Sequence, residues 1–371
     1  MKRVSGLYPQ ICSFENLVTA AYRARLGKRY RPDVAAFQFN LEAELFALRQ
    51  ELTSKTYQPG PYRAFYIRDP KRRLISAAPY RDRVVHHALC QIIEPVFERG
   101  FIHDSYANRT DKGTHAALDR CTAFARRYPF ALKCDIEKYF PTIDHQILLE
   151  RVARKIKCQD TLWLVDRIVA NSNPQEDILR YFPDDDLFTP LDRRRGIPIG
   201  NLTSQFFANI YLDGLDHYVL ETLLPGAYLR FADDFVLFGE TSDKLRRLLK
   251  PLEEHLNGLR LRLHPTKCHI VPVRCGIPFL GWQVFPDHRR LRRRTGVRFQ
   301  RALRTLTSQH REGLIDLKRV RASVMSWIGH LKHGDTYGLR RKLLARAVFG
   351  VGDGNEKKKR EAGSGKKERG V

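Results

Sequence analysis

Two adjacent aspartates interrupt an apolar run, YLRFADDFVLFGE, that extends from Tyr228 to Glu240. The aromatic and aliphatic residues on both sides of Asp233 and Asp234 predict a buried β-hairpin, in which each uncompensated charge costs several kcal/mol to desolvate. An ordinary turn is one explanation, because aspartate is common in tight turns. Phe235, however, follows the aspartates directly, at a place where hairpin turns usually have a glycine. A divalent cation bound by the two carboxylates explains the run better, because such ions prefer carboxylate oxygens.

The charge of the chain points to a polyanionic partner. Its 371 residues include 66 Lys or Arg against 41 Asp or Glu, which gives a net charge of +25 and an isoelectric point near 10.0. Nucleic acid is the leading candidate. A membrane surface is the alternative, but no window approaches the roughly 18 apolar residues of a spanning helix. Seven cysteines without a CxxC pair argue against a disulfide framework and a structural zinc, and favour a reducing cytoplasm.

Local patterns predict several elements along the chain. Helical spacing of apolar residues extends from about Ser13 to Tyr57, and strands are expected over residues 130–136 and 261–273. The adjacent residues His86 and His87 are expected on a helix surface, where they diverge by roughly 100° and are poor joint ligands. No internal repeat of fixed period is evident, which argues against a solenoid.

Basic residues are concentrated towards the C-terminal end. Residues 286–349 contain 17 Lys or Arg and four acidic residues. An ordinary solvated surface mixes the two signs, so this segment is expected to lie along phosphates. Residues 350–371 are rich in Gly, Lys and Glu and have little to bury, and we expect them to be disordered.

A third acid suits the hairpin aspartates. Asp135 ends the apolar strand FALKCDI, 98 residues before Asp233. Two strands that each end in aspartate, set side by side, would hold two metal ions about 3.5–4 Å apart and clamp both oxygens of a phosphoryl transfer. On charge and pattern alone, nucleases and polymerases both fit.

The residues around these acids resemble a known family. KCDIEKYF is similar to motif A of reverse transcriptases, RGIPIGNLTSQFFANIYL to motif B, FADD to motif C, HPTKCHIV to motif D and FLGW to motif E. Upstream, RDRVVHHAL and EPVFERGFIHDSYANRTDKGTHAA resemble the finger motifs of the group II intron lineage. The match runs in order from about Tyr62 to Trp282. Within the lineage, the apolar Ile199 before Gly200, and the Ser204-Gln205 pair, most resemble reverse transcriptases of diversity-generating retroelements.

The resemblance implies an α+β right-hand polymerase fold and RNA-directed DNA synthesis. Its expected parts are an N-terminal helical layer with fingers over residues 1–127, an antiparallel palm over 128–285 and a basic helical thumb over 286–349. Two Mg²⁺ ions are implied as cofactors, with Mn²⁺ as a substitute. The implied partners are template RNA, a cDNA or primer strand, dNTPs and a small basic helical accessory protein, in the cytoplasm and away from membranes.

Motif correspondence also implies the residues that perform catalysis. Asp135, Asp233, Asp234 and the carbonyl of Ile136 are expected to bind the metal ions, and Lys267 to protonate the pyrophosphate leaving group. Surface turn acids, and an ordinary strand-end lysine, are the simpler alternatives.

Other residues are implied to surround the incoming nucleotide. Phe140 is expected to reject a 2′-hydroxyl, with Tyr139 as a competitor and a core aromatic as the alternative. Arg72 and Arg73 are expected to hold the triphosphate, with Lys71 as a further candidate, unless these residues only protect a strand edge from pairing. The templating pair is expected to border Ile199, Gly200, Asn201 and Gln205, and the apolar Ile199 suggests relaxed base selection. Residues 279–282 resemble the primer grip, although a plain hydrophobic turn predicts the same sequence.

Three other functions remain possible from the sequence. An intron-encoded maturase is expected to need splicing and DNA-binding domains after the thumb. A defence-associated reverse transcriptase shares the same site. A non-enzymatic RNA-binding scaffold would tolerate loss of the acids, yet Asp135, Asp233 and Asp234 are all present.

Overall fold

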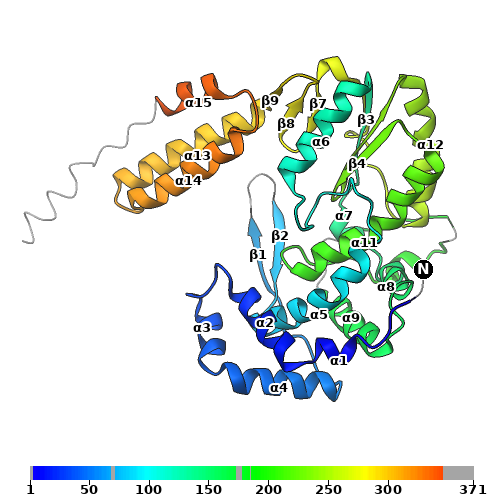
Figure 1. Ribbon diagram of the computed structural model, residues 1–371, viewed down its shortest axis with the longest axis vertical. Helices are drawn as coiled ribbons and strands as arrows, with labels where there is room; N and C mark the ends of the chain where they lie inside the picture. The colour runs from blue at the N-terminus through cyan, green and yellow to red at the C-terminus, as the bar shows by residue number, and fades with distance from the viewer. Residues whose placement is uncertain (1–2, 68–71, 173–177, 184, 346–371) are drawn as a thin grey trace, which may run out of the picture. The chain divides into compact units, whose positions relative to one another are not determined.

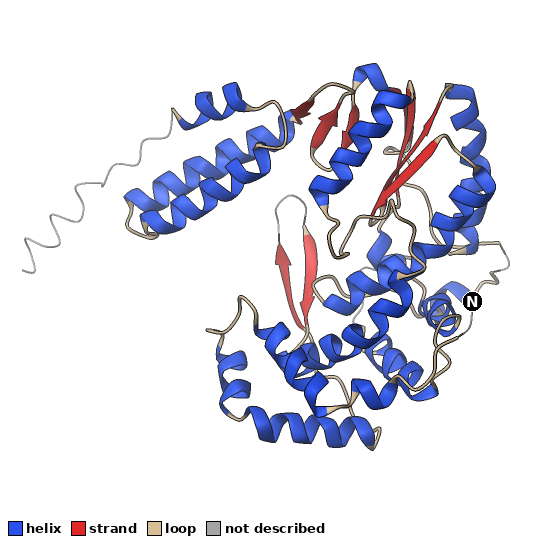
Figure 2. Ribbon diagram, viewed as in Figure 1, coloured by secondary structure: helices blue, strands red, loops and turns tan. Residues whose placement is uncertain are grey.

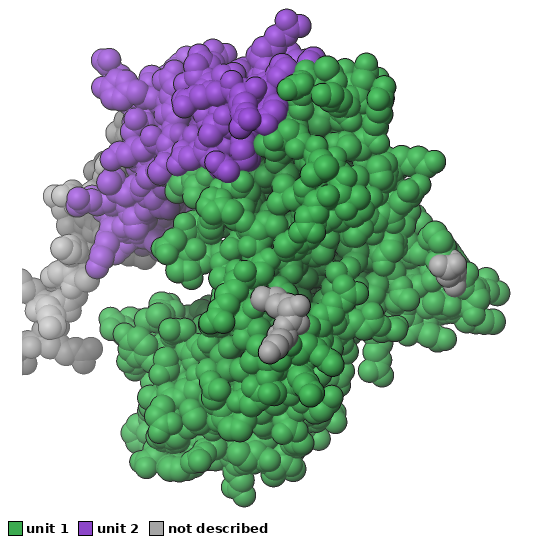
Figure 3. Space-filling view, turned by 45° about the vertical axis from the view of Figure 1, so that its right-hand side comes forward, with its two compact units in different colours: residues 1–117, 132–270 green, residues 118–131, 271–371 purple. Residues whose placement is uncertain are grey.

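The computed structural model describes residues 3–67, 72–172, 178–183 and 185–345. The chain forms two compact units, coloured separately in Figure 3. The first unit comprises residues 1–117 and 132–270, and the second comprises residues 118–131 and 271–371. The segments expected to be disordered, 350–371, lie outside the described residues.

The N-terminal part of the first unit is helical, as the sequence predicts for residues 13–57 (Figure 1). Its helices are α1 (Tyr8–Ile11), α2 (Phe14–Arg25), α3 (Pro32–Phe39), α4 (Leu41–Thr53) and α5 (Tyr80–Glu98). The Ser13 hydroxyl caps α2 by accepting the Asn16 backbone N–H at 3.2 Å. The alanines of α2 are buried and allow it to pack closely on α5. In the chain, the strands β1 (Arg63–Ile67) and β2 (Arg73–Ala77) lie between α4 and α5 of this helical layer.

One prediction about α5 is wrong. His86 is only 2% exposed and therefore lies in the core rather than on a helix surface. The physical reason is that α5 packs against both α2 and α11 (Leu202–Tyr218), so the helix has apolar neighbours on more than one face. His87 is partly exposed, which agrees with the expected divergence of the two side chains.

The β1–β2 hairpin belongs to the first unit, and most residues of the four-stranded sheet also belong to it (Figure 2). The strands β1 (Arg63–Ile67) and β2 (Arg73–Ala77) form an antiparallel hairpin. A four-stranded sheet has the order β4-β5-β3-β6, with strands β3 (Phe130–Asp135), β4 (Ala227–Phe231), β5 (Asp234–Gly239) and β6 (His269–Pro272). β4 and β5 are the antiparallel hairpin predicted from the opening run, with Phe231 opposite Asp234.

The first unit contains further helices after β3. They are α7 (Tyr139–Thr142), α8 (His145–Ala153), α9 (Gln159–Ala170), α10 (Thr189–Asp192), α11, the π-helical turn η1 (Val219–Leu223) and α12 (Ser242–Gly258). The leucines Leu245, Leu252 and Leu256 of α12 are buried, and α12 packs on β5. The helix α6 (Thr114–Arg127) precedes β3. Among the described residues, no helix is both long and apolar enough to cross a bilayer.

The strand expected over residues 261–273 is wrong in its middle. Leu263 forms only an isolated bridge to Ile136, and a turn follows before β6 begins at His269. In that turn the Lys267 N–H donates to the His264 carbonyl at 3.2 Å. Pro265 cannot donate to a β-ladder, which favours the interruption.

The second unit contains a small sheet and three helices. The sheet has the order β7-β8-β9, with strands β7 (Ile277–Phe279), β8 (Trp282–Val284) and β9 (Arg289–Leu291) after the 3₁₀ turn η2 (Val273–Cys275). The helices are α13 (Arg293–Arg311), α14 (Leu317–Leu331) and α15 (Tyr337–Leu344). Phe299, Leu303 and Leu343 form their core, and the Phe299 and Trp327 rings stack. Most arginines of α13 are exposed, as expected for a surface that contacts phosphates.

Candidate active site

The three acids lie at the ends of neighbouring strands. Asp135 ends β3, Asp234 begins β5, and Asp233 lies in the turn between β4 and β5. The Ile136 N–H donates to the Asp233 carbonyl at 3.0 Å, which fixes the end of β3 against the hairpin turn. The sequence prediction that Asp135 adjoins the hairpin aspartates is therefore confirmed.

Two lysines neutralise the acids in this structure. Lys267 donates to the Asp135 carboxylate at 2.6 Å, and Lys133 forms an ion pair with Asp234. Burial lowers the pKa of Lys133 to about 8. The Asp135 and Asp234 side chains are 17% and 22% exposed, so solvent still reaches both carboxylates.

Asp233 has neighbours that oppose its ionisation. Burial, followed by the negative charge of Asp135, raises the pKa of Asp233 above its ordinary value. Both effects agree with the position of Asp233, whose turn lies against the end of β3, which bears Asp135. A cation bound beside Asp233 would offset both the loss of solvation and the repulsion from Asp135.

The acids fit a divalent ion that shares its coordination with a substrate. Over the described ranges, no three His, Cys, Asp or Glu side chains converge closely enough to form a protein cage around a metal. Mg²⁺ usually keeps several waters and is bound by one or two carboxylates together with substrate phosphates. The Asp135 and Asp233 carboxylates match that donor set, while the role expected for the Ile136 carbonyl and Asp234 stays a prediction.

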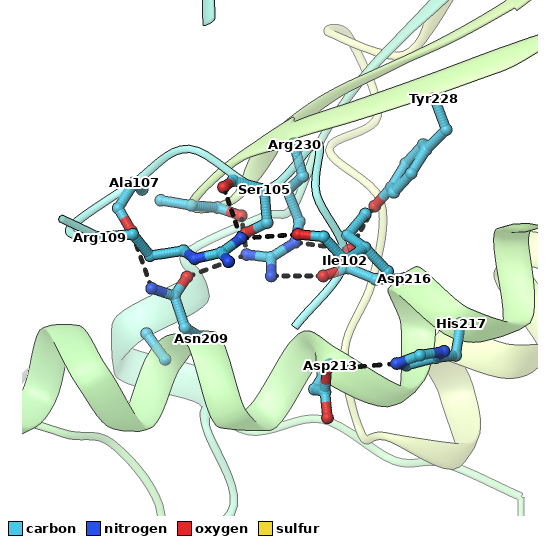
Figure 4. A network of polar contacts seen from close by, with 12 residues as sticks. Ile102, Ser105, Ala107, Arg109, Asn209, Asp213, Asp216, His217, Tyr228 and Arg230 are labelled. Atoms are coloured by element: carbon cyan, nitrogen blue, oxygen red, sulfur yellow. Dashed lines mark hydrogen bonds and ion pairs between the residues drawn. The ribbon is translucent and has the colours of Figure 1, made fainter. Parts of the chain in front are cut away.

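A buried polar network holds the hairpin from behind (Figure 4). The guanidinium of Arg230, on β4, makes two hydrogen bonds to the Asp216 carboxylate at 2.7 and 2.6 Å. The Tyr228 hydroxyl donates to the same carboxylate at 2.7 Å. Burial alone would lower the pKa of Arg230, but the Asp216 charge outweighs it and raises that pKa. Sequence reasoning missed this pair, although an arginine inside an apolar strand poses the same question as Asp233.

The network reaches the hairpin turn itself. Arg230 also donates to the Asn209 side-chain oxygen at 3.3 Å and to the Ala232 carbonyl at 3.1 Å. Ala232 has a left-handed φ of 57°, which is uncommon for a residue with a side chain. Its carbonyl contact with Arg230 stabilises that conformation. The turn that presents Asp233 is therefore held without the glycine that such turns usually use.

The loop before α11 contacts both the segment that follows β3 and the β1–β2 hairpin. On one side, the Gly196 N–H donates to the Ile143 carbonyl at 2.8 Å and the Ile197 N–H donates to the Phe140 carbonyl at 3.0 Å. On the other side, the Ser76 N–H donates to the Ile199 carbonyl at 3.0 Å. These contacts fix the loop at both ends.

Gly200 and Asn201 make the contact with β2 close. Gly200 has φ +117°, and a Cβ atom there would lie 2.9 Å from the Ile75 side chain, so glycine is required. The Asn201 amide binds β2 and the residue after it, with Nδ2 donating to the Ser76 carbonyl at 2.9 Å and Oδ1 accepting the Ala78 N–H at 3.1 Å. Asn201 therefore holds the loop. Gln205, on the first turns of α11, is partly exposed.

The two aromatic residues after Asp135 have different surroundings. Tyr139 is 2% exposed, and its hydroxyl donates to the Ala208 carbonyl at 2.5 Å. Phe140 is partly exposed, and its ring packs edge-on against Tyr139. Tyr139 is thus a core residue, which leaves Phe140 as the better candidate for a residue that contacts the sugar.

The predicted triphosphate residues lie at the end of the β1–β2 hairpin. Arg72 and Arg73 are exposed, and Lys71 lies outside the described residues. The guanidinium of Arg72 stacks over the Tyr66 ring, 4.1 Å from its centroid. This stacking orders the guanidinium and leaves its edges free to bind phosphate oxygens.

A basic cavity of about 620 Å³ opens beside Gly200. Its charged lining residues are Lys28, Arg31, Asp33, Arg63 and Arg83. Burial and the neighbouring arginines lower the pKa of Lys28, and burial also lowers the pKa of Arg83. An excess of partly desolvated cations suits a phosphate backbone.

The expected primer grip forms a tight turn in the second unit. Phe279 and Trp282 pair across the turn between β7 and β8, and both are buried. Leu280 and Gly281 between them have φ values of 45° and 88°. A contact with a primer stays a prediction.

An α+β palm with acids at the ends of two neighbouring strands is the architecture of right-hand polymerases. The comparison with protein families agrees. Residues 68–284, more than half of the chain, match the family described as "Reverse transcriptase (RNA-dependent DNA polymerase)". The chain belongs to this reverse transcriptase family, whose members are nucleotidyltransferase enzymes.

The chain is also similar to several curated proteins. Protein YkfC of Escherichia coli K12 is 28% identical over 73% of this chain and 77% of its own length. The Group II intron-encoded protein LtrA of Lactococcus lactis is 26% identical over 48% of this chain, and the match covers 29% of LtrA. The solved structure of apo telomerase from Candida tropicalis has a TM-score of 0.43 at 14% identity over 66% of this chain and 59% of that chain, a likeness too weak to support a conclusion.

Proposed function

We propose that this protein copies an RNA template into cDNA, with two Mg²⁺ ions, or Mn²⁺ in their place, bound by Asp135 and Asp233 and supported by Asp234 and the Ile136 carbonyl. The observation that carries the proposal is the hydrogen bond between the Ile136 N–H and the turn carbonyl of Asp233, which sets the end of β3, with Asp135, against the turn that bears the poorly solvated Asp233. Family membership supports the same reaction. The net charge of +25 suits a nucleic-acid substrate.

The lysines prepare the carboxylates for this task. When bound, the ions would supply charge stabilisation at the attacking and leaving oxygens. Lys133 and Lys267 meanwhile compensate the acids, so the folded chain does not carry three unpaired carboxylates. Lys267 is 39% exposed, so its ammonium can leave Asp135 and donate a proton to the pyrophosphate leaving group.

The surrounding residues are proposed to select the substrate. Arg72 and Arg73 hold the dNTP triphosphate, and the ring of Phe140 lies under its sugar. Ile199, Gly200 and Gln205 border the templating pair, where the backbone contacts with β2 fix the loop. The basic cavity beside Gly200 would accept the phosphates of the template RNA.

We further propose that the enzyme belongs to a diversity-generating retroelement and misincorporates opposite template adenines, assisted by a small basic helical protein in the cytoplasm. The sequence of the loop, GIPIGNLTSQ, supports this finer assignment. An intron-encoded reverse transcriptase is the second candidate, because Group II intron-encoded protein LtrA is among the relatives. A defence-associated enzyme is the third.

Sequencing of the product tests these proposals. The purified chain would be given a defined RNA, a primer, all four dNTPs and Mg²⁺, beside an Asp233→Asn control, and the cDNA would be deep-sequenced. Errors concentrated at template adenines would support the retroelement assignment, whereas accurate copying would favour an intron-encoded enzyme and untemplated DNA a defence enzyme. Wild-type product no greater than that of Asp233→Asn, with the accessory protein and native RNA also supplied, would contradict the proposed activity.

One substitution tests the role of Ile199. Ile199→Gln adds a polar contact beside the incoming nucleotide, so the proposal expects misincorporation at adenines to fall by several fold. An Ile199→Leu variant, which stays apolar, should retain the wild-type error rate. Equal error rates in all three proteins would remove Ile199 from the account of fidelity.

A further inference from the structure

Two cysteines lie sulfur to sulfur directly behind the candidate active site. The Sγ atoms of Cys134, on β3, and Cys268, just before β6, are 3.0 Å apart, and both cysteines are free thiols. A disulfide bond is about 2.05 Å long. Closing the remaining distance therefore needs a movement of about 1 Å, shared between two adjoining segments of one sheet.

The pair joins the same two segments as the catalytic ion pair. Cys134 immediately precedes Asp135, and Cys268 immediately follows Lys267, which donates to Asp135 at 2.6 Å. Successive side chains of a strand point to opposite faces. Asp135 and Lys133 thus share one face, and Cys134 points to the other. A bond between the sulfurs would form without entering the space that a substrate needs.

We infer that Cys134 and Cys268 are a redox modification site, at which a reversible disulfide ties β3 to the segment that bears Lys267. Cys268 is partly exposed, whereas Cys134 is 0% exposed, so the first attack comes from Cys268. Most disulfides that form in a reducing compartment are transient and serve catalysis or redox sensing.

The oxidant is a low-molecular-weight disulfide, such as oxidised glutathione. The Cys268 thiolate attacks one of its sulfur atoms, forms a mixed disulfide and releases one thiol. Cys134 then loses its proton, attacks the Cys268 sulfur and releases the second thiol. The two protein sulfurs are oxidised, and the small disulfide is reduced to two thiols.

The consequence for catalysis rests on the proposed function. The disulfide holds the turn before β6 against β3, so Lys267 stays on the Asp135 carboxylate. An ammonium fixed there competes with a metal ion for Asp135 and cannot reach a leaving group. We expect the oxidised protein to extend a primer at least fivefold more slowly, and a thiol reductant to restore the rate.

Formation of the disulfide can be tested without measuring enzyme activity. The full chain would be treated with oxidised glutathione, alkylated, digested and examined by mass spectrometry. The expected result is a peptide pair linked through Cys134 and Cys268, absent after reduction and absent in Cys268→Ser. Glutathione on the exposed Cys275 without any Cys134–Cys268 link would overturn the inference.

The functional half uses the same samples. Cys268→Ser should lose the sensitivity to oxidised glutathione, whereas Cys275→Ser, a matched change at an exposed cysteine, should retain it. A linked wild-type protein that extends primers at the reduced rate would overturn control of catalysis by the disulfide. If the reduced protein itself is inactive, the proposed function fails, while the linked peptide still reports on the thiol pair.

Discussion

Two groups of charged residues contact the hairpin β4–β5, and they differ in their exposure to solvent and in the cation that pairs with the acid. Behind the turn, Arg230 and Asp216 are 1% and 0% exposed and form two parallel hydrogen bonds. At the turn, Asp135 and Asp234 are paired with lysines and remain 17% and 22% exposed. The first group is closed to solvent, and the second is open to it.

The choice of cation explains the difference. Arginine offers a rigid planar fork that matches a carboxylate, so Arg230 and Asp216 form a fixed pair. Lysine is a point charge on a flexible chain and can leave its partner at lower cost. Lys133 and Lys267 therefore suit carboxylates that must later bind something else. The comparison predicts that the Arg230 group controls folding and that the lysine-paired group controls activity.

The largest effect is expected from Asp233→Asn. Removing the Asp233 carboxylate, which lies in the same turn as the open group, should reduce primer extension by about a thousandfold or more, because electrostatic stabilisation of the reaction is lost. The thermal midpoint should stay equal or rise, because a poorly solvated charge disappears. Extension assays and thermal unfolding measure the two effects.

The matched control is Glu240→Gln, at an exposed acid beyond the same strand. It should change neither quantity. A large loss of stability in Asp233→Asn would mean that the open group also holds the fold, which would break the comparison.

The next largest effect is expected from Asp216→Asn. This change leaves Arg230 buried without its counter-charge and should cost about 3–5 kcal/mol in the free energy of unfolding. Urea titration followed by circular dichroism measures the loss. Asp243→Asn, at an exposed acid paired with Arg246, should cost less than about 1 kcal/mol. Equal costs for the two variants would contradict the structural role of the closed group.

The Mg²⁺ concentration needed for primer extension should begin to depend on pH at a higher pH than it would if Asp233 had the pKa of an ordinary aspartate. Because burial and Asp135 raise the pKa of Asp233, a proton competes with the metal at a higher pH than usual. As the pH falls through that raised pKa, the Mg²⁺ concentration for half-maximal extension should increase by up to about tenfold per pH unit. Primer–template binding without metal, measured at each pH, serves as the control. A constant midpoint down to pH 5 would argue against a poorly solvated Asp233.

The smallest effect concerns a buried group outside both charge groups. Burial lowers the pKa of His86 from 6.5 to about 3. Below pH 6.5 the unfolded chain therefore binds a proton that the folded chain does not, and stability is lost as the pH falls towards 3. His86→Phe should remove about 1 kcal/mol of the loss between pH 6 and pH 5, as measured by urea unfolding. His103→Phe, at an exposed histidine, should keep the wild-type pH dependence.

Local patterns were sufficient for the acids and the elements that hold them. The apolar run around Asp233 and the strand ending in Asp135 can each be recognised from a few neighbouring residues. The structure confirms both the hairpin and the strand. The helix α8 also begins at a local signal, because the Asp144 carboxylate caps its first turn by accepting the Ile147 N–H at 3.1 Å.

Contacts between distant segments could not be predicted in the same way. The burial of His86 depends on helices packed around α5, and the pairing of Arg230 with Asp216 depends on how α11 meets β4. The thiol contact of Cys134 with Cys268 depends on strand order. In each case the tertiary arrangement determines the partner. The spacing of apolar residues within one segment does not show which distant segment it contacts.

The contacts that complete the site span long stretches of chain. The Asn201 amide binds backbone groups 123 and 125 residues earlier, and Lys267 binds Asp135, 132 residues earlier. A ribosome adds about 5–20 residues per second, so roughly 7–26 s pass between the synthesis of Asp135 and that of Lys267. For the first 98 residues of that interval the nascent chain has Asp135 without Asp233, and Lys267 follows 34 residues after Asp233. We therefore expect that fragments released by ribosomes stalled before Asp233 lack two of the three acids and do not extend primers.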